Sequence, residues 1–267
     1  MTPDRSLPIA MFDSGVGGLT VLRALRSRLP AESFLYLGDT ARLPYGTKSA
    51  ATVQRYALNA AAHLVGNGIK LLLMACNTAS SFALEEVTAA CPVPVLGVVE
   101  PGVRTALDTG ANRIGVIGTE GTIRSGAYQS ALEHLGAGVE VRGAACPLLV
   151  PLAEEGWGDH PVTDEVARHY IQPLLDWGAQ TIILGCTHYP MLRASLQRVV
   201  GPDVRLVDSA SAVTDAVLRR HPELVATEGS PGTIELHLTD ASDSFLRVAH
   251  AILGPETPDP EVVTLGT

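Results

Sequence analysis

Two cysteines in this 267-residue chain occur in matching surroundings. Cys76 follows the apolar run LLLMA and precedes Asn77-Thr78, whereas Cys186 follows TIILG and precedes Thr187-His188. A cysteine that ends a strand and precedes a helix lies where backbone N–H groups and the helix dipole favour the thiolate. Each cysteine thus lies at a corner between a strand and a helix. If the corners at Cys76 and Cys186 face each other, one thiolate could remove a proton from a carbon of a bound molecule while the opposite thiol returns a proton to it. Such a reaction needs no cofactor, provided that the site stabilises the carbanion electrostatically.

Other roles for these cysteines are open at this point. Cysteine often packs as a small buried apolar residue, and a single cysteine of this kind would favour that interpretation. Cys76, Cys186 and His188 could instead supply three zinc ligands, although Cys-x-His is tighter than the usual ligand spacing. Redox chemistry is weakly indicated, because no Cys-x-x-Cys occurs. The repeated polar corner favours catalysis, whereas Cys91 and Cys146 lack it and are expected to be packing residues.

Three ionisable residues could assist the cysteines. Asp13 ends the first apolar run and would face the same sheet edge as Cys76, but it could equally cap the following helix. His188 could exchange protons with Cys186 or simply begin a helix. Glu154 could be a partner in the site or the solvated start of a loop, and the spacing does not decide between these roles.

A glycine-rich run, Gly15-Val16-Gly17-Gly18, follows Asp13. It does not complete the dinucleotide-binding pattern G-x-G-x-x-G, because the sixth position is Thr20, and no Gly-Lys-Ser/Thr of a P-loop occurs. We therefore expect these glycines to form a tight turn beside a cleft.

The composition favours a protein that binds a small molecule. The formal net charge is −9 and no run of Lys or Arg occurs, which argues against nucleic-acid and membrane partners. No apolar stretch approaches the ~18 residues of a membrane span, and the N-terminal apolar run is too short for a signal peptide. Four cysteines in so long a chain do not indicate a disulfide scaffold, so we expect a cytoplasmic protein.

Short apolar runs alternate with amphipathic stretches along the chain. We expect strands at residues 7–12, 33–37, 69–75, 94–98, 113–117, 139–144, 181–184 and 204–207. We expect helices at residues 19–29, 52–65, 80–90, 122–135, 163–177 and 191–200. Near-continuous apolar strands alternating with helices predict a parallel, doubly wound α/β architecture. In that architecture, functional residues gather at the carboxyl ends of the strands.

The sequence also contains two similar segments, which indicate an internal repeat. Residues 9–12 followed by Asp-Ser-Gly-Val-Gly-Gly resemble residues 114–117 followed by Gly-Thr-Glu-Gly-Thr. Their offset is 105 residues (114 minus 9), close to the 110 residues (186 minus 76) that separate the cysteines. Two similar α/β units in tandem are therefore expected, with the cysteines meeting in the cleft between them. Residues 254–260 are expected to form a loose tail.

Several long motifs, in the same order, resemble those of the glutamate racemase family. The resemblance covers residues 8 to about 253. It rests on FDSGVGGLTVL (12–22), YLGDTARLPYG (36–46), ACNTAS (75–80), IGVIGTEGTIRSGAY (114–128), CPLLVPLAEEG (146–156), LGCTHYP (184–190) and VDSA (207–210). Aspartate racemases, the nearest relatives, usually have Cys-Thr-Glu at the second cysteine and lack Asp-Ser-Gly and Pro-Tyr-Gly. Here Cys186-Thr187-His188, Asp13-Ser14-Gly15 and Pro44-Tyr45-Gly46 are all similar to glutamate racemase.

The resemblance implies a role for each matching residue. Cys76 and Cys186 would be the catalytic thiols. Asp13 would be a partner of Cys76, whereas Glu154 and His188 would be partners of Cys186. Glu155 adjoins Glu154 and is the alternative acidic partner. The substrate-binding residues implied are Asp13, Ser14, Tyr45, Gly46, Asn77, Thr78, Thr119, Thr187 and His188. The alternatives to a racemase are a non-catalytic amino-acid-binding protein with two lobes and a structural zinc protein.

The resemblance also implies the fold and the setting. The family has two α/β domains related by a pseudo-two-fold axis, with the active site between them. The first domain would comprise residues 1–98 with 208–267, and the second residues 99–207. The expected activity is cofactor-independent interconversion of L- and D-glutamate, which supplies D-glutamate for peptidoglycan. We expect a cytoplasmic homodimer that binds neither metal nor nucleic acid.

Overall fold

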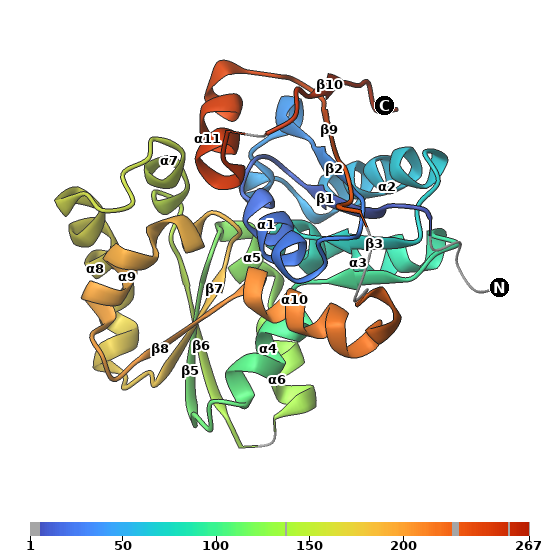
Figure 1. The fold of residues 1–267 in the computed structure, drawn as a ribbon. Helices are drawn as coiled ribbons and strands as arrows, with labels where there is room; N and C mark the ends of the chain where they lie inside the picture. Colours follow the sequence, from blue (N-terminus) through green and yellow to red (C-terminus); the bar gives the residue numbers. More distant parts are fainter. Residues whose placement is uncertain (1–5, 137, 226–229, 256, 267) are drawn as a thin grey trace.

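Two parallel β-sheets form the centre of the molecule in the computed structural model, which describes residues 6–136, 138–225, 230–255 and 257–266. The larger sheet has the strand order β10-β9-β2-β1-β3-β4, and the smaller sheet has the order β6-β5-β7-β8 (Figure 1). The strands are β1 (Ile9–Asp13), β2 (Phe34–Gly38), β3 (Leu71–Met74), β4 (Val95–Gly97), β5 (Arg113–Gly118), β6 (Glu140–Ala145), β7 (Thr181–Gly185), β8 (Arg205–Asp208), β9 (Ile234–Leu238) and β10 (Glu261–Val262). All described pairings are parallel, and the predicted parallel α/β architecture is confirmed.

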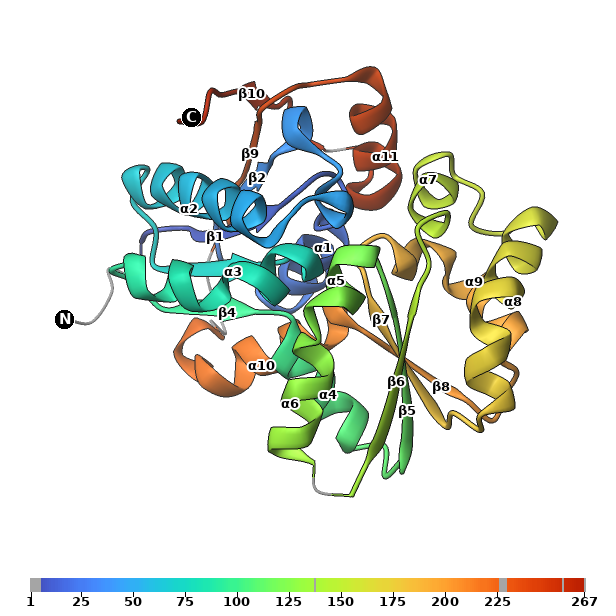
Figure 2. The same ribbon diagram turned by 180° about the vertical axis from the view of Figure 1, so that it is seen from behind.

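Helices cover both faces of each sheet. They are α1 (Leu19–Arg28), α2 (Ala50–Gly66), α3 (Asn77–Ala90), α4 (Val99–Leu107), α5 (Glu120–Ser125), α6 (Ala127–Leu135), α7 (Leu149–Glu154), α8 (Pro161–Asp176), α9 (Arg193–Val200), α10 (Ser209–Arg220) and α11 (Asp243–Leu253). In the larger sheet, one core includes residues of α1, α10 and α11, and the opposite core includes residues of α2 and α3 (Figure 2). In the smaller sheet, α7, α8 and α9 contribute to one core, and α4 and α6 to the other. Every residue of β1, β2, β3 and β7 is therefore buried, which explains their continuous apolar sequences.

The strand order repeats between the two sheets. The order β2-β1-β3-β4 in the larger sheet corresponds to β6-β5-β7-β8 in the smaller one. Cys76 follows β3 and Cys186 follows β7, so each cysteine comes after the third strand of its sheet. The registers Phe12↔Met74 and Gly118↔Gly185 bring the ends of first and third strands to a common edge in both sheets. The internal repeat in the sequence therefore corresponds to a repeated strand topology.

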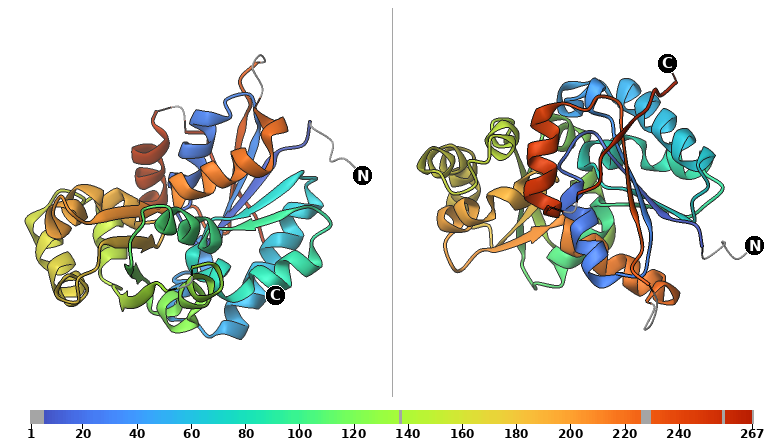
Figure 3. Two further views of the ribbon diagram at one scale, coloured as in Figure 1. Left: turned by 90° about the horizontal axis from the view of Figure 1, so that it is seen from below. Right: turned by 45° about the horizontal axis from the view of Figure 1, so that its top comes forward.

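The end of the chain returns to the larger sheet. After β8, helix α10 lies beside α1 and also contacts α4 (Figure 3). Strand β9 then pairs with β2, and β10 pairs with β9. Within the described residues, no helix combines the length and apolarity that crossing a membrane requires.

The eight predicted strands correspond to β1–β8, but β9 and β10 were not predicted. Residues 254–260, expected to form a loose tail, contain no helix or strand where the structure describes them, with residue 256 outside the described part, but they lead into a paired strand and do not end the fold. Thr257 bonds through both its amide and its hydroxyl to the Gly254 carbonyl, and β10 begins directly after this segment.

The helix predictions also need correction. A single helix was expected over residues 122–135, but the left-handed conformation of Gly126 (φ 68°) separates α5 from α6. Residues 191–200 begin as a 3₁₀ helix (Tyr189–Leu192) before α9. Helices α4, α7, α10 and α11 were not predicted. Two of them carry proline in their sequences (VEPGVRTAL and LVPLAE), and this interrupts the helical pattern.

Candidate active site

A cavity of about 310 Å³ lies where the carboxyl ends of both sheets meet, and both Cys76 and Cys186 line it. All of the predicted site residues except Asp13 line this cavity; they are Ser14, Tyr45, Gly46, Cys76, Asn77, Thr78, Thr119, Glu154, Cys186, Thr187 and His188. Asp13 is fully buried directly behind it. Cavities that bind small molecules typically begin at ~300 Å³.

Cys76 begins helix α3 and caps it with its own sulfur. The Ala79 amide donates to Cys76 Sγ at 3.4 Å, and the thiol donates to Ser14 Oγ at 3.4 Å. Asn77 and Thr78 lie inside the first turn of the helix. Burial and the Asp13 carboxylate raise the pKa of Cys76, the two hydrogen bonds lower it, and the resulting pKa is about 12. Cys76 is therefore a neutral thiol, ready to donate a proton.

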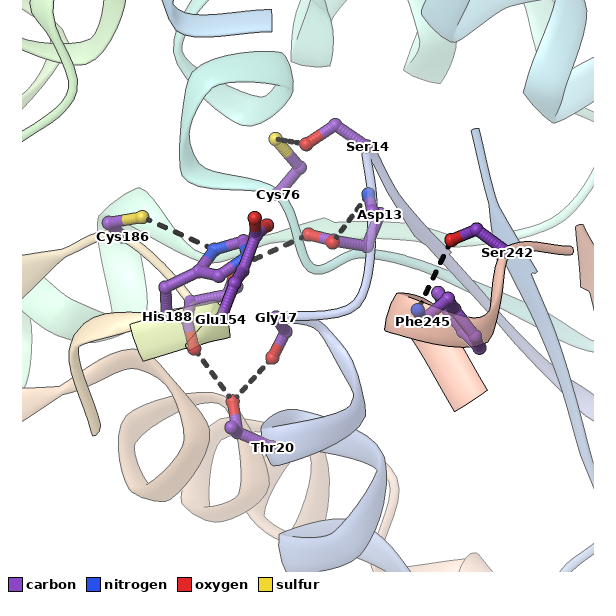
Figure 4. Close-up of polar contacts among 12 residues, drawn as sticks. Asp13, Ser14, Gly17, Thr20, Cys76, Glu154, Cys186, His188, Ser242 and Phe245 are labelled. Carbon is purple, nitrogen blue, oxygen red and sulfur yellow. Dashed lines mark hydrogen bonds and ion pairs between the residues drawn. The ribbon is translucent and has the colours of Figure 1, made fainter. Parts of the chain in front are cut away.

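Cys186 has a different partner, a histidine paired with a carboxylate. His188 Nδ1 lies 3.7 Å from Cys186 Sγ, and His188 Nε2 lies 3.1 Å from Glu154 Oε1 at the end of α7 (Figure 4). Burial lowers the pKa of His188, but the hydrogen bonds to Cys186 and Glu154 outweigh burial and raise it to about 10. A protonated imidazole therefore adjoins the Cys186 sulfur, where it stabilises negative charge. The two corners match in sequence but differ in electrostatics.

Asp13 connects the glycine-rich turn to the corner that carries Cys186. Its Oδ2 accepts from the Gly15 amide at 2.9 Å, and its Oδ1 accepts from the Thr187 hydroxyl at 3.3 Å. The alternative role of Asp13 as a helix cap was wrong, because α1 begins after Gly18 with no side-chain cap.

The glycine-rich turn allows this close approach. A Cβ at Gly18 would lie 2.5 Å from Asp13 Cβ, and a Cβ at Gly17 would lie 2.4 Å from Thr187 Oγ1. Real Cβ atoms do not approach other atoms so closely, so only glycine fits at both positions without a shift of its neighbours. Thr20 adds a bond to the Thr187 carbonyl at 3.2 Å, which fixes the turn against the second corner (Figure 4). The prediction of a tight turn beside the cleft is confirmed.

A cluster of three threonine hydroxyls lies beside the cavity and connects the two halves of the chain. Thr78 Oγ1 lies 2.9 Å from Thr119 Oγ1 and 3.1 Å from Thr122 Oγ1, and Thr119 and Thr122 are 3.0 Å apart. Thr119 also caps α5 by accepting from the Thr122 amide. Thr122 was not predicted, although the spacing Thr-x-x-Thr at the start of a helix could have indicated it.

Tyr45 lines the cavity, and its hydroxyl forms a hydrogen bond to another residue. This hydroxyl donates to the buried carboxylate of Asp39, which also accepts from Arg42 and Thr239. Burial and Asp39 raise the pKa of Tyr45 well above its usual range, so it remains a neutral donor to Asp39. Asp39 was not predicted as a site residue, although it belongs to the motif YLGDTARLPYG.

The remaining cysteines do not line the cavity. Cys146 is buried, burial raises its pKa to about 12, and its thiol donates to the Ala144 carbonyl. Cys91 is partly buried at the end of α3. In the described part of the chain, no three or more His, Cys, Asp or Glu side chains are arranged to hold a metal ion.

Comparisons with known proteins identify relatives. Residues 18–217 match the family model for Asp/Glu/Hydantoin racemase. The glutamate racemase of Geobacter metallireducens is 48% identical over 260 residues, which cover 96% of each chain. The structure of Francisella tularensis glutamate racemase in complex with D-glutamate aligns with a TM-score of 0.90 at 36% identity, covering 98% of both chains. The Thermus thermophilus glutamate racemase in complex with beta-chloro-D-alanine aligns with a TM-score of 0.85 at 42% identity and the same coverage.

Proposed function

This chain belongs to the Asp/Glu/Hydantoin racemase family and is an amino-acid racemase, and from that premise we propose that it interconverts L- and D-glutamate by two cysteine bases without a cofactor. The observation that carries the proposal is the pair of cysteines, one from each sheet, lining a single cavity. The similarity to glutamate racemases supports glutamate as the substrate, and the similar structure from Francisella tularensis is a complex with D-glutamate.

In the proposed reaction, the thiolate of one cysteine removes the α-proton and becomes a thiol. The electron pair of the broken C–H bond remains on the α-carbon, delocalised into the carboxylate. The opposite thiol then gives its proton to the other face of the carbon and becomes a thiolate, so that the configuration is inverted and the atoms balance. The neutral Cys76 thiol, together with protonated His188 beside Cys186, favours Cys186 as base and Cys76 as acid in one direction. The reverse direction exchanges the two roles.

The substrate would be held by the polar groups that line the cavity. The first-turn residues Asn77 and Thr78 present backbone N–H groups at the positive end of α3, which suits the α-carboxylate. Thr187 and Ser14 complete this side of the cavity, and the segment containing Gly46 with Thr119 would hold the side-chain carboxylate. Because the Tyr45 hydroxyl is bonded to Asp39, Tyr45 would contribute its ring and backbone.

We also propose the wider setting that the family implies. Residues 1–98 with 208–267 would form one domain and residues 99–207 the other. The protein would act as a cytoplasmic homodimer that supplies D-glutamate for peptidoglycan synthesis. Light scattering of the purified protein tests the dimer, and rescue of a racemase-deficient bacterium that requires D-glutamate tests the physiological role.

The direct test uses L-glutamate and purified, metal-chelated protein in deuterated water, with L-aspartate in parallel. We expect loss of optical activity with glutamate, together with deuterium at the α-carbon. A folded protein that binds glutamate without exchange would instead be an amino-acid-binding module. Faster racemisation of aspartate than of glutamate would refute the substrate assignment.

A further inference from the structure

A second cavity, of about 380 Å³, lies between helix α2 and the segment that follows β10. It is lined by Arg42 from the 3₁₀ helix Thr40–Arg42, by Arg55 and Tyr56 from α2, and by residues 263–266. None of its lining residues lines the catalytic cavity, and none is acidic. In a chain with a formal net charge of −9, a cavity whose charged lining residues are two arginines should attract an anion.

Arg42 is fixed in the wall of this cavity, with one group of its guanidinium left open. Its Nε donates to both carboxylate oxygens of the fully buried Asp39, at 2.9 and 2.8 Å. Its guanidinium carbon lies 4.3 Å from the centre of the Tyr56 ring, and the buried Nη2 forms no hydrogen bond with the described residues. Nη1 likewise has no partner among them, but it is not buried. Nη1 is therefore the group that a molecule in the cavity can reach.

Arg55 brings a second positive charge to the same ring. Its guanidinium carbon lies 5.4 Å from the centre of the Tyr56 ring, and the residue is exposed. No described carboxylate forms an ion pair with Arg55, whereas Asp39 neutralises Arg42. The cavity therefore keeps an uncompensated positive charge, beside a second guanidinium that still has a free donor.

We propose that this cavity binds the phosphate group of a small phosphorylated molecule, held between Arg42 Nη1 and the Arg55 guanidinium. The two arginines come from different elements and offer donors from two sides. A phosphate monoester carries ~1.5–2 negative charges at neutral pH and has three acceptor oxygens, so it can bind both arginines. A carboxylate has two oxygens in one plane, which a single guanidinium fork already satisfies.

This site is distinct from the catalytic cavity, although one carboxylate lies between them. Asp39 accepts from Arg42 and also from the hydroxyl of Tyr45, which lines the catalytic cavity. The inference does not rest on the proposed function, because it uses none of the residues that would bind or deprotonate the substrate. The volume is that of a small-molecule site, so the cavity also has room for the rest of the ligand.

The test is a calorimetric titration with methyl phosphate at pH 8 and constant ionic strength, in the presence of saturating racemic glutamate. The glutamate fills the catalytic cavity, and a racemic mixture undergoes no net reaction. We expect saturable binding at one site, with an affinity about tenfold lower in Arg55→Gln, as for loss of a charge-assisted hydrogen bond. Malonate, which carries a similar total charge, should bind about tenfold more weakly than methyl phosphate.

Arg219→Gln is the matched control. It removes the same charge from an exposed position in α10 that lines neither cavity, so it should leave the affinity for methyl phosphate unchanged. Both variants should keep the wild-type thermal midpoint, so that a change in affinity reports on the site and not on folding.

Absence of saturable binding to the wild-type protein would overturn the proposal. Equal weakening in Arg55→Gln and Arg219→Gln would do the same, because it would show attraction by net charge alone. Malonate binding as tight as that of methyl phosphate would refute the assignment to a phosphate group.

Discussion

Replacing Glu154 with glutamine tests whether the carboxylate–histidine pair activates Cys186. Glu154 Oε1 lies 3.1 Å from His188 Nε2, and this bond is one of the two that raise the pKa of His188 to about 10. A hydrogen bond to a charged group contributes ~1.5–3 kcal/mol. The Glu154 side chain is 34% exposed, so water screens the interaction and the lower end of this range applies. One pKa unit corresponds to ~1.4 kcal/mol, so the pKa of His188 should fall by about one unit.

The kinetic consequence has a distinctive form. His188 stays protonated at neutral pH but loses the hydrogen bond to the carboxylate that orients it beside Cys186, so proton transfer at this sulfur slows, and we expect kcat/KM to fall by about tenfold. Because the equilibrium constant between enantiomers is one, kcat/KM must fall equally in both directions. The asymmetry appears instead in the primary isotope effect. The α-deuterated substrate should show a larger effect for the enantiomer deprotonated by Cys186 and a smaller one for the other, whose deprotonation by Cys76 becomes less rate-limiting.

The assay is circular dichroism of each enantiomer, protonated and deuterated at the α-carbon. Glu155→Gln is the matched control, since Glu155 adjoins Glu154 but does not line the catalytic cavity. Equal rises in both isotope effects would refute the assignment of Glu154 to Cys186. If kcat/KM falls more in Glu155→Gln than in Glu154→Gln, the partner of His188 is Glu155 and not Glu154.

Three further predictions follow from the same geometry. Cys76→Ala and Cys186→Ala should each abolish racemisation measured by polarimetry, and parental activity in either would refute the two-base mechanism. The pKa of His188 is raised in the folded state, so its stabilising effect is full below its usual pKa of ~6.5 and is lost as pH rises through about 10. In urea unfolding, the difference in free energy of unfolding between wild type and His188→Asn should therefore shrink as pH rises from ~6.5 to about 10. A difference that grows over this pH range would contradict the prediction. Gly18→Ala should destabilise the protein by ~1–3 kcal/mol because its Cβ would overlap Asp13, and an unchanged thermal midpoint would contradict this packing.

The sequence was most informative where one local pattern determines the structure. Strands β1, β2, β3 and β7 are buried throughout, so their apolar runs predict them directly. Strand β9 has the sequence IELHL and lies towards the edge of the sheet, where polar residues are tolerated and the signal is weaker. Helix α10 begins SASAV, with small residues that give little amphipathic contrast but pack closely against α1.

The candidate site could be predicted only in part for a related reason. The cysteine corners are repeated, and each lies within one short motif. The contacts that hold the site together join residues far apart in the chain, such as Asn77 with Ser209 and Asp39 with Thr239. No local spacing encodes such pairs. The different surroundings of Cys76 and Cys186 likewise depend on Glu154, which reaches the site from another helix.

The return of the chain to the larger sheet has a mechanical consequence. The chain passes between the two sheets after β4 and again after β8, and the helices that begin at these crossings, α4 and α10, are in contact. Two adjacent covalent connections permit rotation about the line that joins them and resist twisting about other axes. A rotation about this line would widen the cavity, so we expect the two cysteines to separate and return along the same path in each cycle.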